Sequence, residues 1–161
     1  MIITSTEFKH NEFLQKAQEF NEFGGNGDNR SPALAWADAP AGTKSFAITV
    51  YDPDAPTGSG FWHWVAFDIP LEIQTLPADA GRSDGSKMPA GAIQSQNDYG
   101  HVGFGGACPP EGDKAHRYIF TVHAVAVEKL GVDSATTNAV TRFMLQANTL
   151  ATASITGYYQ R

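Results

Sequence analysis

Residues 52–56, Asp-Pro-Asp-Ala-Pro, join two β-rich runs, 45–51 and 61–69, in one strand–loop–strand segment. Val, Ile, Phe and Trp are frequent in both runs, as is typical of buried strands. Each proline fixes its own φ and keeps the residue before it extended or in a turn, so Asp52 and Ala55 have few conformations open to them. The segment therefore predicts either a rigid loop that holds carboxylates in place or a plain proline-rich hairpin turn with aspartate as turn former.

Strand-like runs separated by turn residues recur along the rest of the chain. Residues 34–36 alternate apolar and small, residues 116–127 form the most continuous apolar run and predict a central strand, and residues 151–159 alternate as a closing strand. Sixteen glycines and nine prolines supply the turns between them. Because no linker or repeat interrupts this pattern, we expect a single mainly β domain over residues 1–161, a sandwich or barrel with one or two short helices.

Two segments have helical periodicity. Apolar residues recur at i, i+3, i+4 and i+7 within 140–147, which predicts an amphipathic helix capped by Ser134 or Thr137. Phenylalanines between residues 8 and 23 recur at roughly helical spacing, and alone they predict a second helix over 13–20. The apolar positions of the later helix are Val140, Phe143, Met144 and Ala147.

Residues 70–107 have no clear periodicity and are rich in glycine and proline. A loop of this length is usually either functional or disordered. Tyr99, His101 and Phe104 alternate with the glycines near its end. Because aromatic side chains favour packing, we expect this loop to be ordered.

Composition and charge narrow the class of protein. Apolar residues make up 42% and charged residues 17% of the chain, which is typical of a globular protein. The formal net charge is −6 without a cluster of Lys or Arg, so we expect no nucleic-acid partner. Cys108 is the single cysteine, which excludes an intrachain disulfide, and the first residues do not resemble a signal peptide. We therefore expect a cytoplasmic protein.

Candidate site residues fall on the two strands that flank these loops. Strand alternation puts His63 on one face of its strand together with Phe67, and it puts His116 and Tyr118 together on one face of the later strand. If the two strands lie near each other, Asp52 and the two histidines converge.

Such a cluster, near the Pro109-Pro110 turn, offers hydrogen-bond donors to an oxyanion. The imidazoles, the Tyr118 hydroxyl and the backbone N–H groups of residues 105–107 can all donate. An aspartate beside a histidine fixes its tautomer and favours its protonated form, which suits a phosphate or a carboxylate. We therefore predict a pocket for a small phosphorylated or carboxylated ligand, and no resident cofactor.

Other interpretations of the same residues stay open. Asp52 and His63 could form the acid–base pair of a hydrolase, although Ser59 and Cys108 are weak candidates for a nucleophile. The indoles on either side of His63 could stack a sugar, but indoles on a strand are more often part of the core. These indoles are Trp62 and Trp64.

Structural roles also compete with functional ones. Arg117 could form an ion pair with a loop carboxylate, and His10 and His123 are typical of structural histidines. Four ligand-type side chains lack the i, i+2 or i, i+4 spacing of metal ligands, so we expect no metal site. They are Asp52, His63, His101 and His116.

Two motifs resemble those of the phosphatidylethanolamine-binding proteins (the PEBP family), also called Raf kinase inhibitor proteins. The first is an apolar strand followed by Asp-Pro-Asp-Ala-Pro at 52–56 and by His63 in the next strand. The second is a glycine-rich, proline-containing turn at 105–112 followed by His-Arg-Tyr at 116–118. The resemblance covers about residues 26–161, and the Trp-His-Trp is similar to that of the bacterial and archaeal YbhB/YbcL branch.

This resemblance implies a PEBP-like β-sandwich of two antiparallel sheets with an anion pocket at one end. It also implies an extended or irregular chain in place of the helix over 13–20, and often a cis peptide bond in the 52–56 loop. Its ligands are of the phospholipid-headgroup type, and a protein partner such as a kinase, a homodimer or a membrane contact is possible. Carried over by motif position, the pocket residues are Asp52, Asp54, Pro56, His63, Gly105, Gly106, Pro109, Pro110, His116 and Tyr118.

Overall fold

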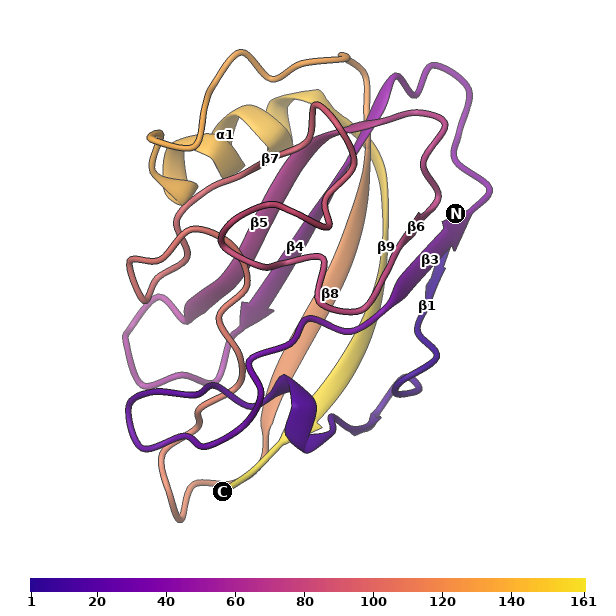
Figure 1. Cartoon of the computed structure of the whole chain (residues 1–161). Coiled ribbons are helices and arrows are strands. Elements are labelled where there is room, and N and C mark those ends of the chain that lie inside the picture. The colour runs from indigo at the N-terminus through magenta and orange to yellow at the C-terminus, as the bar shows by residue number, and fades with distance from the viewer.

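Two β-sheets and one α-helix make up the fold, as predicted, and the computed structural model describes all 161 residues (Figure 1). The smaller sheet has the strand order β1-β3-β6, and the larger sheet has the order β2-β9-β8-β4-β5-β7. The strands of the smaller sheet are β1 (Ile2–Thr4), β3 (Leu34–Ala37) and β6 (Thr75–Leu76). Those of the larger sheet are β2 (Glu12–Phe13), β4 (Ser45–Asp52), β5 (Phe61–Pro70), β7 (Ile93–Gln94), β8 (His116–Val125) and β9 (Thr149–Tyr159).

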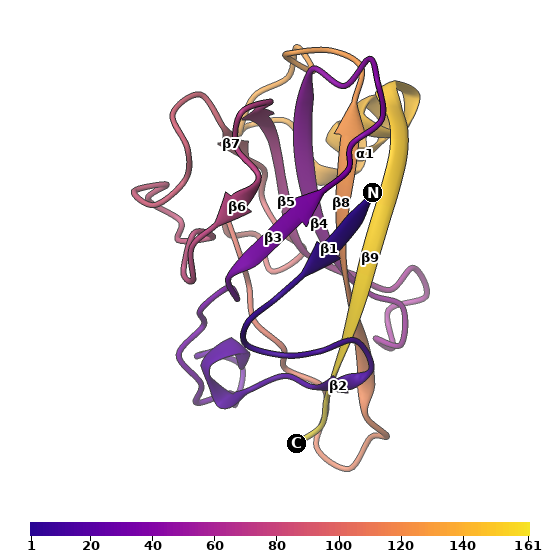
Figure 2. The same ribbon diagram turned by 90° about the vertical axis from the view of Figure 1, so that its right-hand side faces the viewer.

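The main hydrophobic core fills the space between the two sheets. Trp36 on β3 packs edge-on against Phe46 on β4, with ring centroids 5.5 Å apart. Alternate residues of β4 and β8 point into this core, as the twofold period of a strand requires. Figure 2 shows β1 and β3 lying across the face of the larger sheet. Burial of these apolar side chains is the main force that holds the sandwich together.

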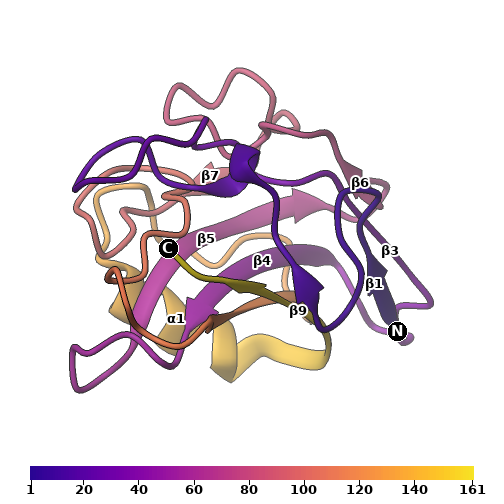
Figure 3. The same cartoon turned by 90° about the horizontal axis from the view of Figure 1, so that it is seen from below.

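The α-helix, α1 (Asn138–Asn148), lies on the other face of the larger sheet (Figure 3). It was predicted, and the Thr137 side chain caps it by accepting a hydrogen bond from the Val140 backbone N–H. The predicted apolar face is wrong, because Phe143 is 73% exposed whereas Thr141 and Leu145 are buried. A hydrogen bond between the hydroxyls of Thr141 and Ser95 (3.0 Å) helps to set the helix rotation, so polar contacts outweigh the apolar stripe.

All five predicted strands are present, as β3, β4, β5, β8 and β9. β8 lies between β9 and β4, which confirms that it is central. The expectation of purely antiparallel sheets is wrong at one edge, because β2 pairs in parallel with β9.

Residues 13–20 contain no α-helix, as the family resemblance implied. A single 3-10 turn, η1 (Lys16–Gln18), follows β2. Apart from the two hydrogen bonds of this turn, the backbone of the segment bonds to distant strands and loops, for example from Leu14 N–H to the Tyr158 carbonyl (2.8 Å). The expected cis peptide bond is absent, since every peptide bond is trans. No helix has the length and apolar character needed to cross a bilayer.

Candidate functional site

One cavity brings the predicted site residues together. It has a volume of about 150 Å³ and lies where the loop between β4 and β5 meets the start of β8. Larger hollows of about 340 and 500 Å³ lie beside α1, but the buried Asp and His side chains of the two motifs meet only in the smaller one. Its lining residues are Asp52, Ala55, Pro56, Thr57, Phe61, His63, Tyr99, Cys108, Pro109, Pro110, His116 and Tyr118.

Seven of the ten predicted site residues line this cavity, and three do not. The three are Asp54, Gly105 and Gly106, which lie outside the cavity lining and contact residues that form it. The seven are Asp52, Pro56, His63, Pro109, Pro110, His116 and Tyr118.

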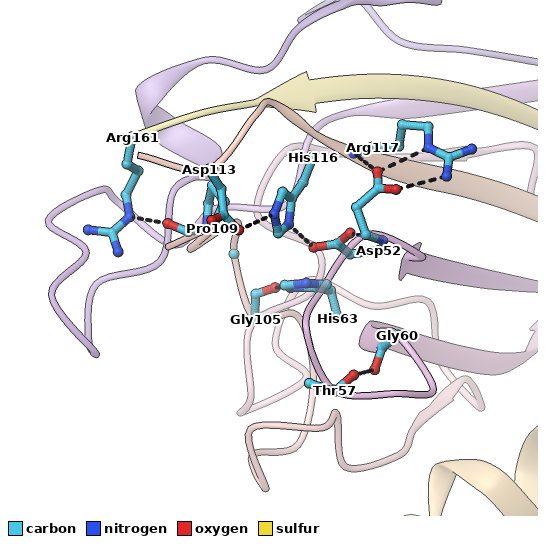
Figure 4. A network of polar contacts seen from close by, with 12 residues as sticks. Asp52, Thr57, Gly60, His63, Gly105, Pro109, Asp113, His116, Arg117 and Arg161 are labelled. Atoms are coloured by element: carbon cyan, nitrogen blue, oxygen red, sulfur yellow. Dashed lines mark hydrogen bonds and ion pairs between the residues drawn. The ribbon is translucent and has the colours of Figure 1, made fainter. Parts of the chain in front are cut away.

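His116 is held between two carboxylates (Figure 4). Its Nδ1–H donates to Asp52 Oδ2 (2.8 Å), and its Nε2–H donates to Asp113 Oδ2 (2.9 Å). Burial disfavours the charged imidazole, but the hydrogen bonds to the two carboxylates outweigh burial and raise the pKa of His116. Because both ring nitrogens face acceptors, the ring is an imidazolium with no N–H left for a ligand.

His63 enters the cavity because β5 contains an extra residue at this point. Val50 pairs with Trp64 and Tyr51 pairs with Trp62, so one step along β4 matches two steps along β5 and His63 has no partner. A β-bulge of this kind redirects a side chain. The predicted alternation, with His63 and Phe67 on the same face, is therefore wrong. His63 packs against Tyr118 in the main core, whereas Phe67 packs on the side of α1.

Two hydrogen bonds join His63 and Gly105, one from the ring and one between the backbones. The His63 Nδ1–H donates to the Gly105 carbonyl (2.8 Å), and the Gly105 N–H donates to the His63 carbonyl (2.8 Å) (Figure 4). Burial of the ring lowers the pKa of His63, although the carbonyl contact opposes this. His63 is therefore neutral near pH 7, and its second nitrogen, Nε2, has no hydrogen-bond partner within the protein.

Two tyrosines line the cavity, but only one has a hydrogen-bonded hydroxyl. The Tyr99 hydroxyl donates to the Gly106 carbonyl (2.9 Å). The Tyr118 hydroxyl is buried and has no hydrogen-bond partner in the protein. Burial and, after it, the nearby Asp52 carboxylate raise the pKa of Tyr118, so it stays a neutral O–H donor; Asp52 lies near the hydroxyl but makes no hydrogen bond with it. An unpaired buried hydroxyl is costly, and because this one faces the cavity, a molecule seated there can supply the partner that the protein does not.

The glycine-rich turn does not offer the free N–H groups that we predicted. The Gly105 N–H is used by the His63 carbonyl, and the Ala107 N–H donates to the Gln18 carbonyl (2.9 Å). The Gly106 N–H donates to Asn29 Oδ1 (2.7 Å). A Cβ on Gly106 would lie 2.4 Å from a backbone carbonyl oxygen, so glycine is required here for close packing. The amides of this turn are thus all bonded within the protein, and the turn supports the cavity wall.

Asp54 faces away from the cavity and pairs with Arg117, as the structural interpretation of Arg117 predicted. Its Oδ1 accepts from Arg117 Nη2 (2.8 Å), and its Oδ2 accepts from Arg117 Nε (3.0 Å). These bonds lower the pKa of Asp54. Its own backbone N–H donates to Asp52 Oδ1 (2.8 Å), so its contribution to the site is to hold Asp52 in place.

Sequence reasoning missed several residues of the site. Tyr99 and Phe61 form an aromatic wall around His63, with centroids 5.6 Å and 4.8 Å from its ring. Asp113 stands three residues before His116, which was a visible signal for a second carboxylate partner. Tyr99 lies in the loop expected to be ordered, but nothing local indicated that it faces His63.

The competing interpretations fare differently. His101 is 55% exposed and lies beside Glu22, and no cluster of three or more His, Cys, Asp or Glu side chains is arranged to hold a metal ion. Trp64 is fully buried in the core. Trp62 lies outside the cavity, and Arg142 covers its ring at 3.9 Å. Neither indole is therefore placed to stack a sugar in this cavity.

The whole chain is similar to proteins of one family. A family model described as "Phosphatidylethanolamine-binding protein" matches residues 4–160. The protein YbcL of Escherichia coli (strain K12) is 55% identical to the chain, and the match covers 98% of this chain and 86% of YbcL. The protein YbhB of the same organism is 46% identical, and the match covers 99% of both chains. The crystal structure of E. coli YbcL, described as a new member of the mammalian PEBP family, matches with a TM-score of 0.97 at 54% identity, covering 99% of this chain and 98% of that one. A PEBP homologue from Chlamydia trachomatis matches with a TM-score of 0.78 at 26% identity, covering 99% and 96% of the two chains.

Proposed function

This chain belongs to the phosphatidylethanolamine-binding protein family, and we propose that its cavity binds a small ligand through a phosphate or carboxylate group. The observation that carries this proposal is the buried Tyr118 hydroxyl, which has no partner in the protein. It faces the cavity beside His63, whose Nε2 is also without a partner. An oxyanion seated there would accept from the hydroxyl and remove the cost of leaving it unpaired.

The geometry does not favour the hydrolase alternative. Asp52 Oδ2 bonds His116, and His63 Nδ1 bonds the Gly105 carbonyl, so the proposed Asp52–His63 acid–base pair is not formed. Cys108 lines the cavity, but its Sγ faces backbone carbonyls at 3.5 and 3.8 Å, and burial raises the pKa of the thiol. A thiol with a raised pKa is a poor nucleophile, so nothing in the cavity is activated for attack.

A titration with phosphate and phosphorylethanolamine, followed by calorimetry or by NMR shifts, tests the proposal. We expect saturable binding by the wild type and weaker binding by His63→Ala. His123→Ala is the matched control, because His123 is a half-buried histidine that lies in a different hollow beside α1. Absence of binding at millimolar ligand, or equal loss in both variants, would count against the proposal.

The wider functional expectations stay predictions. These are the cytoplasmic location, a protein partner such as a kinase, the homodimer and the membrane contact. A ligand titration reports on none of them, so each needs its own measurement.

A further inference from the structure

We propose that the cavity selects an oxyanion that still carries a proton, such as the monoanion of a phosphate monoester, and that neutral His63 accepts the hydrogen bond from that proton. This inference rests on the proposed function and narrows its ligand class. It favours a free phosphorylated metabolite or inorganic phosphate over the phosphodiester of an intact phospholipid.

The first argument is the orientation of the His63 ring. A carbonyl oxygen can only accept, so the nitrogen 2.8 Å from the Gly105 carbonyl must be Nδ1–H. In a neutral imidazole the other nitrogen is then a lone-pair acceptor. The bond from the Gly105 N–H to the His63 carbonyl holds the two backbones together and keeps the Gly105 carbonyl within reach of Nδ1. Nε2 therefore presents a lone pair to the cavity, and a fully deprotonated anion would be repelled there.

The second argument is the absence of a free cation around the ligand space. No Lys or Arg lines the cavity. His116 is charged, but Asp52 and Asp113 take both of its N–H groups, so the three side chains together carry one negative charge. Arg161 is directed elsewhere, since its Nε donates to the Pro109 carbonyl (2.8 Å) (Figure 4). A dianion has no compensating charge here, whereas a monoanion suffers less repulsion.

The charged and titratable neighbours of His63 come from several elements. Asp52 on β4 and Asp98 on the loop after β7 favour the protonated ring, and the charged His116 on β8 lines the same cavity. Tyr118 on β8 and Tyr99 and Cys108 on the loops are neutral. Burial is the largest of these influences, so the ring is neutral before the ligand arrives.

Among the lining side chains, Asp52 is already bonded to His116 and to the Asp54 N–H, which leaves the Tyr118 O–H as the donor and His63 Nε2 as the acceptor without a partner. A monoprotonated phosphate monoester matches this pair, because its P–O⁻ accepts from Tyr118 while its P–O–H donates to His63. A phosphodiester, a sulfate and a carboxylate carry no such proton near neutral pH. The second pKa of a phosphate monoester is about 6, so the required monoanion is abundant at that pH.

Wild-type protein titrated at pH 6 with methyl phosphate, dimethyl phosphate and sulfate tests this selection without any variant. We expect methyl phosphate to bind roughly 10- to 100-fold more tightly than either of the others, because each of those leaves Nε2 facing an oxygen that has no proton. Equal affinity for all three would overturn the selection while leaving the anion site intact. Binding of none of the three would refute the selection and the proposed function together.

The ¹⁵N spectrum of His63 gives a second, independent readout. In the complex with methyl phosphate we expect the neutral Nδ1–H tautomer, with the proton of the hydrogen bond remaining on the ligand. A spectrum of the imidazolium in the complex would show that His63 binds as a donor and would overturn the proposal. His123 in the same spectrum is the internal control, because it lies away from the cavity and should not respond.

Discussion

Replacement of Tyr118 by phenylalanine should stabilise the free protein and weaken its binding of phosphate. Tyr118 is 2% exposed, and its hydroxyl makes no hydrogen bond within the protein. The free protein therefore bears the cost of burying an unpaired polar group. Removing the oxygen keeps the ring and its packing. If about 1 kcal/mol of that cost is recovered, the melting temperature rises by roughly 2–4 °C for a chain of this size.

Binding should change in the opposite direction. A hydrogen bond to a charged group contributes about 1.5–3 kcal/mol, so the Tyr118→Phe variant should bind methyl phosphate roughly 10- to 100-fold more weakly. Saturating ligand should then reverse the order of the two melting temperatures, because the wild type gains more stability from the complex than the variant does. Thermal unfolding with and without methyl phosphate measures both effects in one assay.

Tyr99→Phe is the matched control. Tyr99 lines the same cavity, but its hydroxyl donates to the Gly106 carbonyl (2.9 Å), so its removal leaves that carbonyl unpaired. We expect this variant to lose about 1 kcal/mol of stability and to bind methyl phosphate with little change. If Tyr118→Phe destabilises the free protein as much as Tyr99→Phe does, then the hydroxyl is satisfied within the fold and the reasoning is refuted.

Three further predictions concern other parts of the fold. Burial lowers the pKa of His123 to about 4, below its unfolded value. The neutral ring therefore contributes stability above pH 6.5, and this stability is lost as the pH falls toward 4. In a plot of urea midpoint against pH, His123→Gln should flatten the curve over this range. Asp54→Asn should cost under about 1 kcal/mol in urea unfolding, because its pair with Arg117 is partly exposed, and should change phosphate affinity by less than about twofold. Gly106→Ala should destabilise the protein by about 3 kcal/mol or more, since the new Cβ would lie 2.4 Å from a backbone atom. Gly58→Ala is the control, because a Cβ there has open space and should cost only about 1 kcal/mol for the positive φ. Similar urea midpoints for the two variants would contradict this prediction.

The sandwich was predictable because each strand has a local signature. The apolar run of β8 and the paired runs around residues 52–56 follow from burial alone. The rotation of α1 was not predictable in the same way. Thr141 is buried through its bond to Ser95, forty-six residues earlier in the chain, and no window of local sequence contains that contact.

In the candidate site, too, some features could be predicted from the sequence and others depend on contacts distant in the chain. The two motifs indicated most of the lining residues, because the family resemblance placed them by position. The assignment of donors failed, because the N–H of Gly106 is taken by Asn29, which lies 77 residues away. The direction of His63 failed because strand alternation assumes a regular strand, and β5 is bulged at that residue.

The bulge makes the position of His63 a matter of chain length as well as of residue type. Loss of one residue from the Trp62–Trp64 segment would restore regular pairing with β4 and turn the ring out of the cavity, even in a sequence that keeps every histidine. Insertion of one residue would also shift the pairing with β4 and move the His63 ring out of the cavity. During divergence, this segment should therefore tolerate exchanges of one side chain for another more readily than insertions or deletions. A homologue of altered spacing there is expected to have lost the site while keeping the sandwich.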